Sequence, residues 1–187
     1  MARLARKIMF LGAKQLLELV KEKKLMEGLC ERELTAPEGA GFDIRIGEIY
    51  KISGKGFMGV TERETPKMEL IAKYEEGKTV RVFLEPKVYY LMKTIEKVNM
   101  PDDLLAISTP RSTLFRSGVY IFGGQVPPGY CGELSMGIYN FRDEPFDLEM
   151  GARVLHIMFS EVAGESNLYK GQWQGGRVTT EQKEKQI

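Results

Sequence analysis

The sequence predicts a mainly β protein with one short helix near its N-terminus. Residues 12–24 have the spacing of an amphipathic helix, whereas the rest of the chain consists of short apolar runs with alternating or β-branched character. Gly and Pro separate these runs, as they do in all-β proteins. With 187 residues, 43% of them apolar, the chain has the usual size of one domain, so we expect a single domain over 1–187.

The predicted helix at 12–24 places Leu16, Leu17 and Val20 on one face, and charged residues fill the other positions. Gly28 follows as a stop signal. We therefore expect this helix to pack its leucine face against the β structure.

Seven apolar runs follow the helix, and each predicts a strand. The stretch 53–78, rich in Gly, Lys and Glu, predicts either a hairpin or a mobile loop. The polar and charged end of the chain, 177–187, predicts a mobile tail. The expected strands are 42–52, 79–85, 88–98, 104–109, 118–123, 133–141 and 152–162.

Charge and composition exclude several classes of protein. The net charge is +1 with interleaved signs, which argues against polymeric DNA or RNA as a partner but leaves room for a compact anion such as a triphosphate. Cys30 and Cys131 have no metal-ligand spacing and read as reduced thiols. Arg3, Arg6 and Lys7 precede no cleavable signal, and no run approaches the roughly 20 apolar residues of a membrane span. We expect a cytoplasmic protein without a membrane partner.

The polar segment 109–118 carries two arginines between two predicted strands. Arg111 and Arg116 lie five residues apart, with Ser112 and Thr113 between them. Guanidinium groups and hydroxyls are donors that suit phosphate oxygens. The segment predicts a phosphate site, and a solvated turn with surface arginines is the alternative.

Tyr130 lies in the segment 123–140, where the two Gly and two Pro residues that surround it predict a rigid turn, with a strand beginning near Glu133. An aromatic ring held by such a turn suits contact with a sugar or a base. A tyrosine that only closes the end of the sheet is the alternative.

Two further segments carry chemistry-bearing residues. In 38–47, glycines precede Asp43 at the start of a strand, which fits either a close approach to a ligand or a plain turn. In 169–178, Lys170 and Arg177 flank glutamines and glycines, which fits a flap over an anion or a frayed end.

The order of these segments resembles the motif set of the dCTP deaminase/dUTPase family, and the helical start and the tail look most like its archaeal-type dUTPase branch. A β-sandwich with an unrelated ligand is the alternative, and it requires the ordered motifs to be a coincidence. The matching segments are GFDI (41–44), RSTLFR (111–116), VPPGYCGEL (126–134), the G-x-R at 151–153 and YKGQWQG (169–175).

The resemblance implies a dUTPase-like distorted β-barrel or jelly roll, a homotrimer with active sites between subunits, and a deoxyribonucleoside triphosphate as ligand. It also implies that Mg²⁺ arrives on the triphosphate and is not held by protein ligands. By matched position, Tyr130 lies against the deoxyribose and excludes a 2′-OH, and Asp43 orients the active-site loops. Lys170 and Gln174 close over the ligand, and the residues expected at the phosphates are Arg111, Ser112, Thr113 and Arg116.

The chain departs from the family pattern at both catalytic carboxylates. Gly137 stands where the deaminases have a glutamate that transfers protons, and Pro127 stands where dUTPases have an aspartate that activates water. Asp43 and Glu133 are the candidate substitutes. The sole histidine, His156, lies in an alternating strand and is interpreted as structural.

Three functions remain open. The first is a dUTPase-like pyrophosphatase that converts dUTP and water to dUMP and diphosphate. The second is a dCTP deaminase that uses Glu133 in place of the missing glutamate. The third is a catalytically silent nucleotide-binding homologue, which the loss of two carboxylates would produce.

Overall fold

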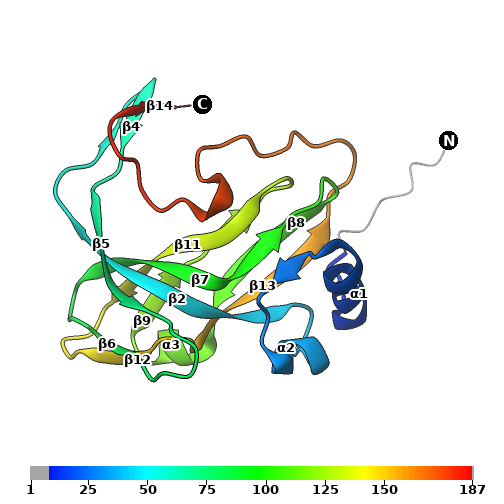
Figure 1. The fold of residues 1–187 in the computed structure, drawn as a ribbon, viewed down its shortest axis with the longest axis horizontal. Helices are drawn as coiled ribbons and strands as arrows, with labels where there is room; N and C mark the ends of the chain where they lie inside the picture. Colours follow the sequence, from blue (N-terminus) through cyan, green and yellow to red (C-terminus); the bar gives the residue numbers. More distant parts are fainter. Residues whose placement is uncertain (1–8, 187) are drawn as a thin grey trace.

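The computed structural model describes residues 9–186 (Figure 1). The remaining residues, 1–8 with Arg3, Arg6 and Lys7, and Ile187, lie outside this range. In chain order the elements are α1 (Ala13–Lys23), β1 (Met26–Glu27), α2 (Glu31–Thr35), β2 (Phe42–Ser53), β3 (Phe57–Met58), β4 (Glu62–Glu64), β5 (Lys67–Lys73), β6 (Arg81–Leu84), β7 (Tyr89–Asn99), β8 (Leu104–Pro110), α3 (Ser112–Arg116), β9 (Val119–Phe122), β10 (Gln125–Val126), β11 (Cys131–Asn140), β12 (Phe146–Glu149), β13 (Arg153–Glu161), the 3₁₀ turn η1 (Gln174–Gly176) and β14 (Glu184–Lys185).

One curled antiparallel sheet dominates the molecule (Figure 1). Its strands follow the order β10-β8-β13-β2-β7-β11-β9, with β1 added to β7 and β5 added to β2. Register shifts interrupt the pairs β2–β7, β11–β7 and β13–β2, and such bulges increase the bend and twist of a sheet. This architecture is the mainly β distorted barrel that the sequence predicts.

The seven predicted strands are all present, within two residues of their expected ends. Strand β7 shows the reason most clearly, because its buried and less buried side chains alternate along its length. Met92 and Val98 face the core from β7, Ile138 faces it from β11, and Phe42 and Phe159 meet there edge to face with ring centroids 6.4 Å apart.

The predicted helix is confirmed as α1. Leu16 is fully buried, and Leu17 and Val20 pack against the core, so the expected face is the buried one. The helix ends at Lys23, before Gly28, because Lys24 adopts the left-handed conformation (φ 53°) and its N–H closes the helix on the carbonyl of Val20 at 3.1 Å.

The stretch 53–78 forms a hairpin, β3–β4, followed by β5. The end of the chain folds back onto this hairpin, where β14 pairs with β4, so β3, β4 and β14 form a small separate sheet. Thr65 and Thr180 hold the two segments together through reciprocal N–H to Oγ1 hydrogen bonds of 2.9 Å each. Residues 177–186, for which the polar composition predicts a mobile tail, have these defined contacts in the structure.

Candidate functional site

A largely apolar hollow lies between the outer face of the sheet and the C-terminal segment that passes over it. Its volume is about 510 Å³, and most of its wall is apolar. Strands β5, β7, β10 and β11 form its floor, and the loop and turn at 169–178, orange to red in Figure 1, form its outer wall. We call it the Tyr130 pocket; its lining residues are Thr65, Met68, Leu91, Gln125, Val126, Pro127, Tyr130, Leu134, Ser135, Tyr169, Trp173, Arg177 and Val178.

Tyr130 is held rigidly in this pocket. Gly129 precedes it with φ +79°, a conformation that favours glycine. Two backbone hydrogen bonds hold the turn against Met100: the Gly129 N–H donates to the Met100 carbonyl (3.0 Å), and the Met100 N–H donates to the Tyr130 carbonyl (2.8 Å). The hydroxyl donates to the carbonyl of Glu133 at 2.6 Å, and the ring meets Tyr169 edge to face at 5.5 Å. Burial raises the pKa of Tyr130 to about 12, so the phenol stays neutral.

Gln174 fastens the C-terminal segment to the turn that carries Tyr130. Its side-chain oxygen accepts from the N–H of Cys131 at 2.8 Å, and its side-chain nitrogen donates to the carbonyl of Gly129 at 2.9 Å. One amide group therefore satisfies a donor and an acceptor of the same turn. Lys170, predicted to act beside Gln174, is exposed and does not line the pocket.

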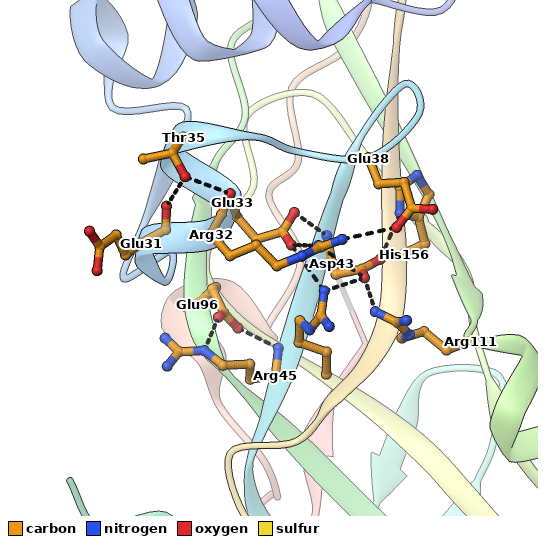
Figure 2. Close-up of polar contacts among 11 residues, drawn as sticks. Glu31, Arg32, Glu33, Thr35, Glu38, Asp43, Arg45, Glu96, Arg111 and His156 are labelled. Atoms are coloured by element: carbon orange, nitrogen blue, oxygen red, sulfur yellow. Dashed lines mark hydrogen bonds and ion pairs between the residues drawn. The ribbon is translucent and has the colours of Figure 1, made fainter. Parts of the chain in front are cut away.

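A second polar site centres on Asp43, at the start of β2 (Figure 2). Its carboxylate, 6% exposed as a residue, accepts hydrogen bonds from Arg111 and from Arg153 (3.1 Å), and His156 Nδ1 lies 3.0 Å from its other oxygen. The backbone N–H of Asp43 donates to the fully buried Glu33 at 3.0 Å. Asp43 therefore joins β2, β13 and the residue that follows β8, and its role in orienting active-site loops stays a prediction.

Arg111, expected at a phosphate, thus makes an ion pair with Asp43 in this structure. A hollow of about 340 Å³ opens beside that pair, and Ser112 and His156 also line it. Ser112, Thr113 and Arg116 are exposed on the short helix α3.

Burial lowers the pKa of His156, with the charge of Arg111 acting in the same direction and Glu33 opposing it. A neutral ring that donates its Nδ1–H to Asp43 fits this environment. The interpretation of His156 as a structural residue therefore remains the simplest one.

The chain by itself does not bring the predicted site residues together. Tyr130 and Gln174 belong to the Tyr130 pocket, whereas Asp43, Arg111 and Ser112 belong to the second hollow, and the two hollows share no lining residue. Helix α3 lies at the end of the molecule opposite the C-terminal segment (Figure 1). Glu133, the second candidate substitute for a lost carboxylate, lies next to Tyr130, with its carboxylate 3.6 Å from Lys97 Nζ.

Neither position of the missing carboxylates offers an acid or base. Pro127 lines the Tyr130 pocket with its ring. Gly137 lies on β11 between Leu91 of β7 and Phe122 of β9, and the Tyr89 phenol covers it so closely that a Cβ at position 137 would overlap its hydroxyl. Tyr89 in turn contacts Phe122, with ring centroids 5.9 Å apart.

Within residues 9–186, no group of three or more His, Cys, Asp or Glu side chains has the arrangement of a metal site. In the same part of the chain, no helix has both the length and the apolar character needed to cross a membrane.

Comparison with known proteins identifies the family. A family model described as dCTP deaminase-like matches residues 10–162, most of the chain. The chain belongs to the dCTP deaminase-like family. The matched range includes Asp43, the α3 segment and the Tyr130 turn, which carry the sequence motifs.

Individual relatives support this membership. The chain is 31% identical over 169 residues to a dCTP deaminase of Pyrococcus furiosus, covering 90% of this chain and 96% of the relative. It is 30% identical to a protein of Dictyoglomus turgidum named dCTP deaminase, dUMP-forming, covering 87% and 86% of the two chains.

Among solved structures, the 2′-deoxycytidine 5′-triphosphate deaminase of Agrobacterium tumefaciens shares the fold, with a TM-score of 0.63 at 18% identity. That match covers 83% of this chain, which spans about half (47%) of the Agrobacterium chain.

Several pocket residues of this dCTP deaminase-like chain had no recognisable sequence signal. Thr65 and Met68 come from the stretch 53–78, which lacks periodicity and therefore gave no register. Leu91 looks in the sequence like any other strand residue, and only the position of the C-terminal segment over it makes it part of a pocket wall. Trp173 and Arg177, in contrast, belong to the glycine-rich segment that the sequence marks as a flap.

Proposed function

We propose that the protein acts on a pyrimidine deoxynucleoside triphosphate, and that dCTP deamination is its reaction. The observation that carries the proposal is the 31% identity over 90% of the chain to a protein named dCTP deaminase. Because the relatives reported above bear that name, dCTP deamination takes precedence over the dUTP hydrolysis favoured by the motifs alone.

The Tyr130 pocket supports a binding mode for this substrate. Its volume of about 510 Å³ falls in the range typical of small-molecule sites, and its apolar wall suits a sugar and a pyrimidine ring. Tyr130, fixed by its turn, would contact the deoxyribose, and the segment fastened by Gln174 would cover the ligand.

The phosphates would then be bound by a second copy of the chain. Since the second hollow shares no residue with the Tyr130 pocket, one chain does not supply both halves of the expected site. We therefore propose a homotrimer in which α3 of one copy faces the Tyr130 pocket of the next. Ser112, Thr113 and Arg116 are exposed and free to meet a triphosphate that carries Mg²⁺.

Deamination requires water to add at C4 of cytosine and ammonia to leave, with proton transfer at both steps. Gly137 transfers no proton, and we propose that Glu133 takes this role. Glu133 follows Tyr130 by three residues, and the Tyr130 hydroxyl donates to its main-chain carbonyl, which fixes the backbone there. Its carboxylate lies 3.6 Å from Lys97 Nζ and is not part of the pocket lining, so it must turn towards the ligand to act. The loss of a general base costs about 10²–10⁴-fold in rate, so a low turnover is expected if Glu133 substitutes poorly.

The test is incubation of the purified protein with dCTP, and separately with dUTP, in the presence of Mg²⁺, followed by chromatographic separation of the nucleotides. Formation of dUTP or dUMP from dCTP supports the proposal, and E133Q should abolish it. Formation of dUMP from dUTP alone would instead favour hydrolysis. Absence of both products at high enzyme concentration would exclude both reactions.

A silent nucleotide-binding homologue is the second candidate, and the Tyr89 phenol over Gly137 favours it, because this contact removes the place of the catalytic side chain. Calorimetric titration with a non-hydrolysable dCTP analogue separates the candidates. Binding without turnover supports the silent homologue, and absence of binding contradicts it together with the enzyme.

A further inference from the structure

Two arginines from distant parts of the chain share one carboxylate beside the Tyr130 pocket. Arg63, on β4, reaches Glu184 Oε1 with Nη2 at 3.1 Å and Nε at 3.3 Å. Arg177, which follows η1, reaches the same Oε1 with Nη1 at 3.3 Å and Oε2 with Nη2 at 2.9 Å. Four N–H groups therefore converge on Glu184 of β14, an arrangement typical of bound carboxylates and phosphates.

The two guanidinium groups also lie over the Trp173 ring, with the Cζ atom of Arg63 4.5 Å and that of Arg177 5.9 Å from the ring centroid. Trp173 and Arg177 line the Tyr130 pocket, and Arg63, which is not a lining residue, contacts this wall through the Trp173 ring. The side chain of Arg63 is only 12% exposed, which means that its guanidinium is held in place and is not a free surface charge.

The charges at this position do not balance. In the described part of the chain, Glu184 is the sole acidic partner of both Arg63 and Arg177, so two positive charges face one negative charge. The neighbouring Lys183 is already paired with Glu62 at 2.8 Å. Burial raises the pKa of Glu184, but the bonds from Arg177 and Arg63 outweigh it, and the lowered pKa keeps the carboxylate charged at neutral pH.

We propose that Arg63 and Arg177 form an anion-binding site in the wall of the Tyr130 pocket, and that Glu184 occupies this site as an internal anion. One phosphate of a ligand in the pocket replaces Glu184, while the remaining phosphates face α3 of the second copy, because a phosphate offers more acceptor oxygens and more negative charge to the same donors. The identity of the ligand as a nucleotide rests on the proposed function, whereas the anion site itself rests on the arginine pair.

Replacement of Glu184 has a structural consequence. Strand β14 has only two residues paired with β4, Glu184 with Arg63 and Lys185 with Glu62. When the carboxylate leaves, this short strand loses its strongest side-chain contact, and the segment over the pocket is held mainly by Gln174 and the Thr65–Thr180 bonds. Ligand entry and release of β14 are therefore coupled.

The test uses Trp173, the only tryptophan, as a fluorescent reporter of the site. Wild-type protein and the variants E184Q, E181Q and R63Q are titrated with inorganic tripolyphosphate, which carries no base. E184Q, which lacks the internal anion, should bind about tenfold more tightly than wild type. E181Q replaces an exposed acid in the same segment and should bind tripolyphosphate with the affinity of wild type. R63Q should lose the change in Trp173 fluorescence. Equal affinities of wild type and E184Q would overturn the proposal.

A second measurement works on the unmodified protein and does not depend on how the variants fold. Hydrogen exchange of the Glu184 and Lys185 amides is followed with and without tripolyphosphate. Faster exchange with the anion supports displacement of β14, and unchanged or slower exchange contradicts it.

Deoxycytidine, which has no phosphate, separates this inference from the proposed function. If the protein neither binds deoxycytidine nor converts dCTP, the proposed function fails, and the tripolyphosphate result on E184Q still decides the anion site. If dCTP is converted but E184Q and wild type bind tripolyphosphate equally, only the anion site fails.

Discussion

The hydroxyl of Tyr89 lies in the volume that a Cβ atom at position 137 would occupy. The Tyr89 ring therefore packs directly on the backbone of Gly137, which has no side chain. The two residues lie on paired neighbouring strands, β11 and β7. A larger residue at 137 therefore requires Tyr89 to move, and the two positions form one unit in any attempt to restore a carboxylate here.

The first prediction concerns that unit. G137E alone should lower stability by about 1–3 kcal/mol, the usual cost of forcing extra atoms into a packed site, and thermal melting will measure it. Adding Y89A removes the overlapping ring, so G137E/Y89A should recover part of the loss and raise dCTP deamination above both single variants. The control is G124E, because a Cβ at Gly124 meets open space. A double variant no more stable than G137E would contradict the coupling.

Asp43 gives the second prediction. D43N removes the negative charge that Arg111 and Arg153 share; Arg153 keeps Glu33 at 3.4 Å, whereas Arg111 loses its acidic partner within the described residues. Unfolding in urea should show a loss of about 3 kcal/mol. D102N, at an exposed aspartate, should leave the midpoint unchanged. A similar loss of unfolding free energy in both variants would show that the ion pairs of Asp43 do not contribute more to stability than an exposed aspartate does.

The third prediction concerns pH and Glu48 on β2. Burial raises the pKa of Glu48, but hydrogen bonds from Lys93, Tyr50 and Lys73 outweigh it and lower the pKa from 4.5 to about 2. A carboxyl with a depressed folded-state pKa adds stability that is present above pH 4.5 and is lost as the pH falls towards 2. The stability gap between wild type and E48Q should therefore be constant near neutrality and shrink below pH 4.5.

Chemical denaturation at pH 7, 4 and 3 measures this gap. The exposed Glu69 of the adjacent strand β5 provides the control, and E69Q should show no comparable change with pH. A gap for E48Q that stays the same from pH 7 to pH 3 would rule out the predicted linkage.

The fourth prediction concerns the fastening of the C-terminal segment. Q174A removes both bonds to the Tyr130 turn, so Trp173 should become more exposed and its emission should shift to longer wavelength. Because Gln174 is exposed, the stability change should stay near 1 kcal/mol. Q182A, at an exposed glutamine nearby, should leave the emission unchanged, and an unshifted spectrum for Q174A would exclude the fastening role.

The strands were predictable because each is long enough to show its periodicity, as in β7, where buried and exposed positions alternate. The bounds of β3 and β4 were not, since two or three residues carry no period, even though a hairpin was one of the two expectations for 53–78. Strand β14 was not predicted because its partner β4 lies more than a hundred residues earlier in the chain. The same reason explains why the contacts of residues 177–186 had no signal in the sequence, since Glu184 meets Arg63 and Thr180 meets Thr65.

The candidate site was predictable in its parts and not in its arrangement. The Tyr130 turn stands out in the sequence through its Gly and Pro residues. The segment 111–116 stands out through its two arginines, Arg111 and Arg116. Their separation into two hollows follows from the path of the strands, which a linear motif does not contain. The pairing of Arg111 with Asp43 was likewise not predictable, because the two positions are 68 residues apart in the sequence.

The small sheet of β3, β4 and β14 can be completed only late in synthesis. During synthesis the hairpin at 57–64 emerges early, with the edge of β4 unpaired and with Phe57, Met58 and Val60 exposed, and its partner strand at 184–185 emerges more than a hundred residues later. Until then the nascent chain presents a free strand edge beside apolar side chains, a combination that promotes association with other chains.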